Sequence, residues 1–347
     1  MAITNQDARS AVIGLFGREP DEVEWPGGRS RRTFCVRYDE TRYAVSKRGG
    51  PGRARLEATI LERLQDSGHT PELVLCRDEW VVQSWTPGQR LAERLALNPT
   101  PALVAEAAAT LARLQRAGTM AGLDRIAPRI GQKAGWLDRF SGLPASLAEN
   151  CGLPPPAFDG AGIRSILSAP PASFVKWDSR PGNALIDPSS GRAVWIDWEH
   201  AGCRVIADDL AWLVCDEWFP DDRNLETAAI SGFCAEYSNR FDFDFGRYLS
   251  AFGCLHTMVR INLVLDFQSS HGWGDRAHLL AKDKIGATPD LLKRLAIRGA
   301  RWAARYPETE GLTDFFVRLS SSTFSASSTA APETDSETDS ETGNDTA

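Results

Sequence analysis

The sequence lacks the residue patterns that mark secreted, membrane-spanning and zinc-binding proteins. No run of about eighteen apolar residues occurs in its 347 residues, and the start, MAITNQDARS, lacks the charged-then-apolar order of a secretory signal. The seven cysteines form no CxxC pair, and the five histidines show no metal-ligand spacing. These absences argue against a disulfide framework and a zinc site, and they predict a cytoplasmic protein with free thiols.

Two common nucleotide-binding fingerprints are also missing, and so is an excess of positive charge. Neither GxxxxGK[ST] nor GxGxxG occurs, which disfavours P-loop and Rossmann enzymes. The net charge is −7, and the six acidic residues of the C-terminal tail account for all but one unit of it. A near-neutral body argues against nucleic-acid binding, and nothing in the sequence indicates a membrane partner.

The length and composition suit one large or two closely packed domains followed by a tail. Hydrophobic residues make up 42% of the chain, enough for a substantial core. Residues 320–347 are a low-complexity stretch rich in Ser, Thr, Glu and Asp, which cannot bury enough apolar surface to fold. We therefore expect 320–347 to be a disordered tail.

The most informative stretch is 174–198, FVKWDSRPGNALIDPSSGRAVWIDW. An apolar, β-branched run ends at Asp178, the turn-rich DSRPGN carries Asn183, and the strand after DPSSG ends at Asp197. We expect one hairpin to bring these three side chains together.

Carboxylate and amide oxygens of this kind are the ligands that Mg²⁺ accepts alongside water and phosphate oxygens. The spacing D-x-x-x-x-N is that of a kinase catalytic loop, whose Asp receives the acceptor's proton and whose Asn holds metal. Arg180, followed by proline, would place a fixed positive charge near a transferring phosphoryl group. The alternative is a polar β-turn with a capping Asp and Asn.

The segments KWDSRPGNALID and VWIDWEHAG resemble the HGDxHPGNxLxD and xIDWExAG motifs of the aminoglycoside phosphotransferase and choline kinase-like family. The resemblance implies a two-lobed protein-kinase-like α+β fold. It also implies that Asp178 is the catalytic base and that Asn183 and Asp197 are metal ligands. The sequence departs from the family at Lys176 and Trp177, where His and Gly are usual. This departure bears on the catalytic efficiency and on the conformation of the loop that carries Asp178.

Residues 1–86 are predicted to form the N-lobe, with a short helix that starts at a capping box of Thr4 and Asp7, an antiparallel sheet and a further helix. The first turn of the sheet contains Gly27, Gly28 and Ser30, whose backbone N–H groups could approach phosphates without obstruction from Cβ atoms. An ordinary Gly-Gly hairpin turn is the alternative.

Lys47 ends the strand YAVSK, the placement of the kinase lysine that contacts the α- and β-phosphates, and a surface charge is the alternative. Glu57, on a helix expected over 53–65, would pair with Lys47 and aim its ammonium at the nucleotide. Glu62 is the competing partner, and ARLEATIL favours Glu57 because it resembles the family's Arg-x-x-Glu pattern. The alternative for both glutamates is a solvated helix face.

The pattern TPGQRL breaks the last strand of the N-lobe and predicts a hinge. In a fold of this kind the nucleotide base would pair with backbone groups near Gln83 to Trp85. Side-chain identity at these positions says little about the base, so ATP and GTP both remain open.

Residues 87–319 are predicted to form a mostly helical C-lobe. Only eleven residues separate Asp197 from Asp209, too few for the activation loop of a protein kinase, so we expect a small-molecule acceptor. The resemblance implies that Asp209 braces the catalytic loop. Acidic and aromatic residues at 216–222 would suit a cationic acceptor, and a solvated acidic loop is the alternative.

The sequence therefore predicts a Mg²⁺-dependent transfer of the γ-phosphoryl group of ATP or GTP to a hydroxyl of a small molecule. A second hypothesis is a nucleotide-binding pseudokinase that regulates or scaffolds, motivated by Lys176 and Trp177. The intact Asp178, Asn183, Asp197 and Lys47 weigh against that alternative.

Overall fold

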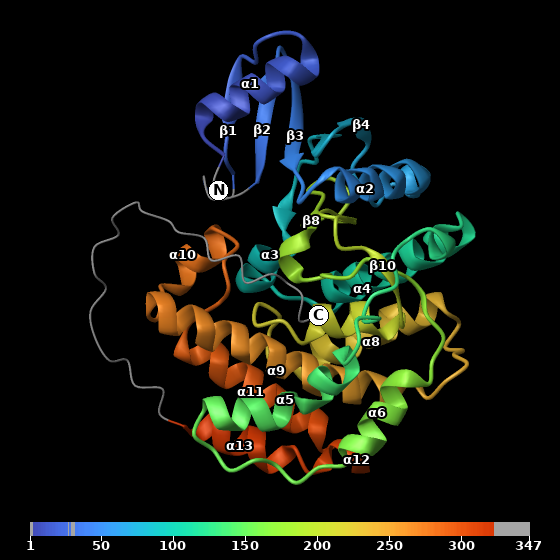
Figure 1. The fold of residues 1–347 in the computed structure, drawn as a ribbon, viewed down its shortest axis with the longest axis vertical. Helices are drawn as coiled ribbons and strands as arrows, with labels where there is room; N and C mark the ends of the chain where they lie inside the picture. Colours follow the sequence, from blue (N-terminus) through green and yellow to red (C-terminus); the bar gives the residue numbers. More distant parts are fainter. Residues whose placement is uncertain (1–2, 27, 29–31, 323–347) are drawn as a thin grey trace.

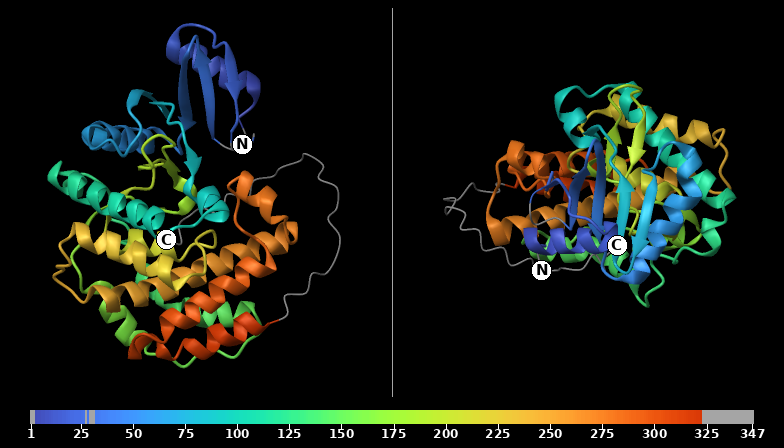
Figure 2. Two further views of the ribbon diagram at one scale, coloured as in Figure 1. Left: turned by 180° about the vertical axis from the view of Figure 1, so that it is seen from behind. Right: turned by 90° about the horizontal axis from the view of Figure 1, so that it is seen from above.

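The computed structural model describes residues 3–26, 28 and 32–322. A small N-terminal part, built around one antiparallel sheet, stands on a larger C-terminal part that is mostly helical (Figure 1). The same division is seen from behind in Figure 2. Most of the predicted tail lies outside the described residues, and the boundary placed at residue 86 remains a prediction.

The N-terminal sheet has five antiparallel strands in the order β1-β2-β3-β5-β4. Helix α1 (Asn5–Phe16) starts at the predicted capping box of Thr4 and Asp7 and ends at Gly17, whose φ is +74°. It packs on the sheet through a separate small apolar cluster that includes Val12, Phe34 and Val45. The strands are β1 (Glu22–Glu24), β2 (Thr33–Tyr38), β3 (Thr41–Lys47), β4 (Leu73–Arg77) and β5 (Trp80–Ser84).

Helix α2 (Pro51–Leu64) connects β3 to a 3₁₀ turn (Gln65–Ser67) and packs beside β4 and β5. Its apolar side chains Ile60, Leu61 and Leu64 belong to the main core, while Glu57 is fully buried on the same helix. A buried glutamate needs charged or hydrogen-bonding partners, so this part of α2 points toward a polar centre.

The C-terminal part is built around the 27-residue helix α9 (Phe245–His271). Within the described residues α9 alone is long and apolar enough to cross a membrane, but 83% of its apolar window is buried inside the fold. The other helices are α3 (Leu91–Leu97), α4 (Pro101–Met120), α5 (Trp136–Asn150), α6 (Gly160–Ser168), α7 (Ala207–Val214), α8 (Arg223–Glu236), α10 (Arg276–Ala281), α11 (Pro289–Ala303), α12 (Pro307–Glu310) and α13 (Thr313–Ser321), with 3₁₀ turns at Leu123–Arg125 and Pro181–Asn183.

Two small sheets position the loops of the expected site. One contains β6 (Gln89–Arg90), β8 (Ala184–Ile186) and β9 (Ala193–Trp195), and the other pairs β7 (Ser173–Val175) with β10 (Gly202–Arg204). The expectation that one hairpin carries all three polar residues is therefore wrong in part. Asp178 follows β7, which pairs with β10, whereas the hairpin itself consists of β8 and β9. The turn-rich segment after Asp178 connects these two sheets.

Close packing between α4 and β7 requires glycine at position 118. A Cβ atom built on Gly118 would lie 2.2 Å from Cδ1 of Phe174, which is fully buried at the strand leading to Asp178. Gly14, in contrast, lies in α1 with nothing within 4 Å of an added Cβ. The pair provides a matched test of this packing.

We expect Gly118→Ala to lower the free energy of unfolding by about 1–3 kcal/mol through overpacking. Gly14→Ala should instead raise it by about 0.5–1 kcal/mol, because alanine loses less backbone entropy in a helix. Urea unfolding followed by circular dichroism measures both. Equal stability of the two variants would contradict the packing of Phe174 against α4.

Candidate active site

Asp209 of α7 holds the loop that carries Asp178. Its buried carboxylate accepts hydrogen bonds from the backbone N–H groups of Lys176 and Trp177, both at 2.8 Å, and from the Ser179 hydroxyl at 3.2 Å. Gln115 of α4 donates a further bond at 2.8 Å. Burial raises the pKa of Asp209, and these donors oppose that rise. The contacts confirm the predicted bracing of the loop.

Three residues of the site have backbone angles that side-chain-bearing residues rarely adopt. Trp177, Asp178 and Asp197 have φ values of +53°, +48° and +61°. Such left-handed residues cost free energy and persist only where surrounding contacts hold them. Trp177 is 4% exposed and packs edge-on against Trp212 and Phe252. This angle explains why a related family would use glycine at position 177.

Lys176 joins the two left-handed segments. Its side chain is fully buried, and Nζ donates to the backbone carbonyl of Asp197 at 2.9 Å and to that of Asp178 at 3.4 Å. The ammonium also lies over the rings of Trp198 and Trp195, at 5.4 and 5.9 Å from their centroids. Burial lowers the pKa of Lys176, while nearby carboxylates oppose the change. Lys176 therefore ties the Asp178 loop to the Asp197 segment.

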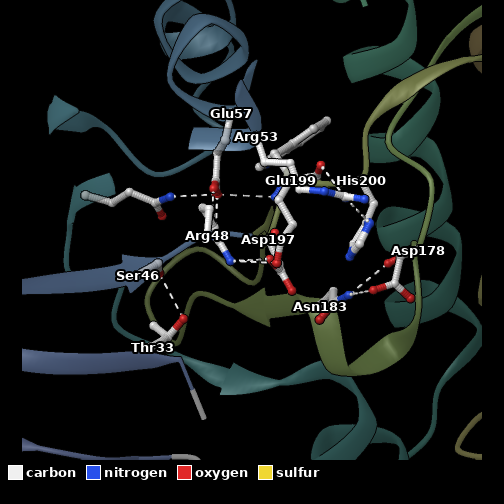
Figure 3. A network of polar contacts seen from close by, with 12 residues as sticks. Thr33, Ser46, Arg48, Arg53, Glu57, Asp178, Asn183, Asp197, Glu199 and His200 are labelled. Atoms are coloured by element: carbon white, nitrogen blue, oxygen red, sulfur yellow. Dashed lines mark hydrogen bonds and ion pairs between the residues drawn. The ribbon is translucent and has the colours of Figure 1, made fainter. Parts of the chain in front are cut away.

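The structure brings Asp178, Asn183 and Arg180 together as predicted. The Asn183 amide donates to Oδ2 of Asp178 at 2.9 Å and to its backbone carbonyl at 2.8 Å (Figure 3). Nε of Arg180 lies 3.3 Å from Oδ1 of Asp178, and its Nη2 lies 3.8 Å from Asp283. The Asp178 carboxylate is thus oriented by one amide and one guanidinium.

Asp197 follows the end of β9 and lies beside Asn183. The backbone N–H of Ile196 donates to the carbonyl of Asn183 at 2.9 Å, which fixes Asp197 beside Asn183. The side chain of Asp197 is 35% exposed, and the ion pair with Arg48 and the ammonium of Lys176 outweigh burial and lower its pKa. The site therefore presents a carboxylate that is ionised at neutral pH.

These oxygen donors fit a hard divalent cation. Asn183 uses its NH₂ group toward Asp178, which leaves its amide oxygen available next to the Asp197 carboxylate. Across residues 3–26, 28 and 32–322, no three His, Cys, Asp or Glu side chains gather as a metal site. A metal here would need Asn183 and phosphate oxygens as well as carboxylates, and the two predicted ligands remain predictions.

The predicted pair of Lys47 and Glu57 is wrong. Nζ of Lys47 lies 3.4 Å from Glu79 and 5.5 Å from the ring centroid of Trp80, and its side chain is 43% exposed. Successive residues of a strand point to opposite faces of the sheet. Lys47 lies two residues after Val45, which packs toward α1, so its side chain points away from the C-terminal part.

Arg48 occupies the position predicted for Lys47. Its Nε and Nη2 bond both carboxylate oxygens of Glu57, and Nη1 lies 2.9 Å from Oδ1 of Asp197 and 3.2 Å from Oε1 of Glu199 (Figure 3). Burial by itself would lower the pKa of Arg48, but the three carboxylates raise it. Strand alternation places Arg48 on the face of Ser46, opposite to that of Lys47, and the packing of Val45 against α1 decides which of the two faces Glu57.

The side chain of Gln83 supports Glu57. Its side-chain amide donates to Oε1 of Glu57 at 2.9 Å, and its backbone lies between β3 and β4. The backbone N–H of Trp85 already donates to the carbonyl of Arg42 at 3.1 Å. The predicted pairing of a nucleotide base with the backbone at Gln83 to Trp85 stays a prediction.

The glycine turn is described only at Gly28. Its φ is +93°, and its N–H donates to the carbonyl of Trp25 at 3.0 Å. Gly27 and Ser30 lie outside the described residues. The predicted contacts of this turn with phosphates are therefore untested.

The acidic cluster after α7 is not a solvated loop. Asp216 and Glu217 are buried and pair with Arg260, at 3.5 Å and 2.7 Å. Burial and the adjacent Glu217 carboxylate raise the pKa of Asp216. Asp221 pairs with Arg301, and the side chain of Asp222 caps α8. These carboxylates already have partners, so the cluster does not support a cationic acceptor.

Comparison with known proteins gives one family and many solved structures. A family model described as phosphotransferase enzyme family, APH, matches residues 23–249. No curated protein matches the chain. Similar solved structures include spectinomycin phosphotransferase, APH(9)-Ia, in complex with ADP and spectinomycin, at 12% identity and a TM-score of 0.56, covering 85% of this chain and 98% of the other.

Two further structures are similarly distant. The GDP complex of aminoglycoside 2′-phosphotransferase-IIIa has 15% identity and a TM-score of 0.53, with 86% and 99% of the two chains covered. A choline/ethanolamine kinase family protein from Mesorhizobium loti has 17% identity and a TM-score of 0.52, with 91% and 99% covered. At these identities the likeness shows the fold, and it confirms the predicted protein-kinase-like architecture.

We expect Trp177→Gly to lower the free energy of unfolding by about 2–4 kcal/mol. The loss of a buried indole outweighs the relief of a left-handed backbone angle. Asp78→Gly is the matched control, because Asp78 also has φ +53° but lies exposed in the turn between β4 and β5. Chemical denaturation should show Asp78→Gly unchanged or slightly stabilised. A Trp177→Gly variant as stable as wild type would mean that indole packing does not hold the loop.

Proposed function

Because the chain belongs to the phosphotransferase enzyme family, we propose that it transfers the γ-phosphoryl group of a nucleoside triphosphate to a hydroxyl of a small molecule. The observation that carries the proposal is the convergence of Asp178, Asn183 and Asp197, two of them at left-handed backbone angles. Strained polar residues cluster where a chain must hold reacting groups in one geometry.

In this proposal Asp178 accepts the proton of the acceptor hydroxyl, and the amide of Asn183 keeps its carboxylate oriented. Arg180 places a positive charge next to the attacking oxygen and the transferring group. Asn183 and Asp197 would hold Mg²⁺, which offsets phosphate charge when bound. Most of the catalysis then comes from positioning and electrostatics.

The nucleotide in this proposal is ATP or GTP, since the solved relatives are complexes with ADP and with GDP. The acceptor is a small hydroxyl compound, as spectinomycin is in one relative. The seven cysteines are unpaired, which suits a reducing compartment such as the cytoplasm. Lys176 and Trp177 both make contacts that hold the loop, which favours a catalytic protein over the pseudokinase alternative.

Nucleotide binding should depend on magnesium and on Asp197. At 100 times its dissociation constant, a nucleotide with Mg²⁺ should stabilise wild type by roughly 2.7 kcal/mol. Asp197→Asn should lose most of this stabilisation, and Asp290→Asn, an exposed substitution on α11, should keep it. Thermal unfolding with ATP and GTP, with and without Mg²⁺, measures the effect. An undiminished shift in Asp197→Asn would remove Asp197 from the site.

Phosphoryl transfer should depend on Asp178 more strongly than nucleotide binding does. With an acceptor found by screening spectinomycin and choline among other hydroxyl compounds, Asp178→Asn should reduce kcat by about 10²–10⁴-fold. Its affinity for the nucleotide should stay within a few-fold of wild type. Product formation followed by mass spectrometry measures the rate. If turnover survives the substitution, another group is the base.

A further inference from the structure

The acidic cluster after α7 contains one residue, Glu217, that positions a distant part of the chain. Its buried carboxylate pairs with Arg260 of α9 and also accepts the backbone N–H of Gly286 at 3.0 Å. The indole N–H of the adjacent Trp218 donates to the carbonyl of Lys284 at 3.1 Å. These bonds fix the chain that follows α10, a stretch outside both sequence motifs.

In this stretch Asp283 has a left-handed backbone angle, with φ of +51°. Its N–H donates to the carbonyl of Leu280 at 3.0 Å, and the N–H of Lys284 donates to the carbonyl of Leu279 at 2.9 Å, a common way for a helix to end. Glycine is usual at the left-handed position of such an end. An aspartate there costs free energy, which contacts of its side chain must offset.

The Asp283 carboxylate lies against the loop that carries Asp178. Its Oδ2 is 3.8 Å from Nη2 of Arg180, and Nε of the same guanidinium is 3.3 Å from Oδ1 of Asp178. A Cβ atom built on Gly182 would lie 2.2 Å from Oδ1 of Asp283, so a larger residue at position 182 would displace this carboxylate. All three charged side chains are largely buried, and water therefore screens their charges only weakly.

Two carboxylates thus share one guanidinium. Burial by itself would lower the pKa of Arg180, but the carboxylates of Asp178 and Asp283 raise it, so both attract the cation. With Asp178 as its only nearby partner, Arg180 would favour a two-pronged pair that engages both carboxylate oxygens. Oδ2 of Asp178 already accepts from the Asn183 amide at 2.9 Å, which leaves Oδ1 as the oxygen for an acceptor hydroxyl.

We propose that Asp283 is a positioning residue for phosphoryl transfer, because its carboxylate holds the Arg180 guanidinium back from a two-pronged pair with Asp178. This leaves Oδ1 of Asp178 open to the acceptor hydroxyl. The inference rests on the proposed function and adds to it a residue from outside the motifs. Asp283 exchanges no proton in the reaction, and Arg180 keeps its charge throughout.

The test measures steady-state turnover of ATP and of GTP with Mg²⁺ by the full-length protein, with water as the acceptor and with any acceptor found by screening. Asp283→Asn keeps the shape of the side chain, and asparagine also adopts left-handed angles, so the variant should fold as wild type by circular dichroism. Its kcat should fall by about tenfold, while KM for the nucleotide should stay within about twofold. Asp290→Asn, which removes an exposed carboxylate on α11, should leave both constants unchanged.

A double-mutant cycle with Arg180→Gln separates positioning from a purely structural role. If Asp283 acts through Arg180, adding Asp283→Asn to Arg180→Gln should lower kcat no further. A structural role would instead lower kcat by the same factor in both backgrounds.

Three results would overturn the inference by itself. They are an unchanged kcat in Asp283→Asn, an equal loss of kcat in the Arg180→Gln background, and loss of the thermal stabilisation by Mg²⁺ and nucleotide in Asp283→Asn. The last result would mean that the carboxylate supports the nucleotide site and not Arg180. Wild type that transfers phosphate neither to water nor to any screened hydroxyl compound would overturn the proposed function together with this inference.

Discussion

The buried carboxylate of Asp209 is the constraint on which the rest of the site depends. It takes hydrogen bonds from two consecutive backbone N–H groups, of Lys176 and Trp177, and so fixes the chain just before Asp178. Burying a carboxylate without a cation in direct contact is costly, and four donors offset that cost. Together with the packing of Trp177 and the bonds of Lys176, this side chain of α7 holds Trp177 and Asp178 at their left-handed backbone angles.

The second constraint is a polar contact between the two parts of the molecule. Arg48 and Glu57 come from the sheet and α2, whereas Asp197 and Glu199 come from the C-terminal part. Arg53 of α2 adds a bond of 2.8 Å to His200. Charged contacts of this kind are directional and exchange with water or ligand oxygens more readily than packed apolar surfaces do. The interface is thus suited to change when a charged ligand enters.

The two departures from the family motif are compensated within the fold. The packing of Trp177 against Trp212 and Phe252 offsets the cost of its backbone angle. Lys176 donates to two backbone carbonyls, whereas a neutral imidazole has one N–H and could donate to only one of them. Lys176 lies over the rings of Trp195 and Trp198, whereas Trp177 packs against Trp212 and Phe252. The loop is therefore held by two separate sets of aromatic contacts.

The sequence by itself determined what local rules encode: the capped helix at Thr4, the strand pattern of the N-terminal sheet, and the motif residues Asp178, Arg180 and Asn183. It could not determine which of two adjacent cations pairs with Glu57, because strand register and the packing of Val45 under α1 decide between Lys47 and Arg48. Nor could it show that Asp216 and Glu217 are neutralised, since their partner Arg260 lies on α9, far along the chain. Short-range patterns are written in the sequence, whereas the pairing of distant charges is settled only when the chain folds and burial removes water from between them.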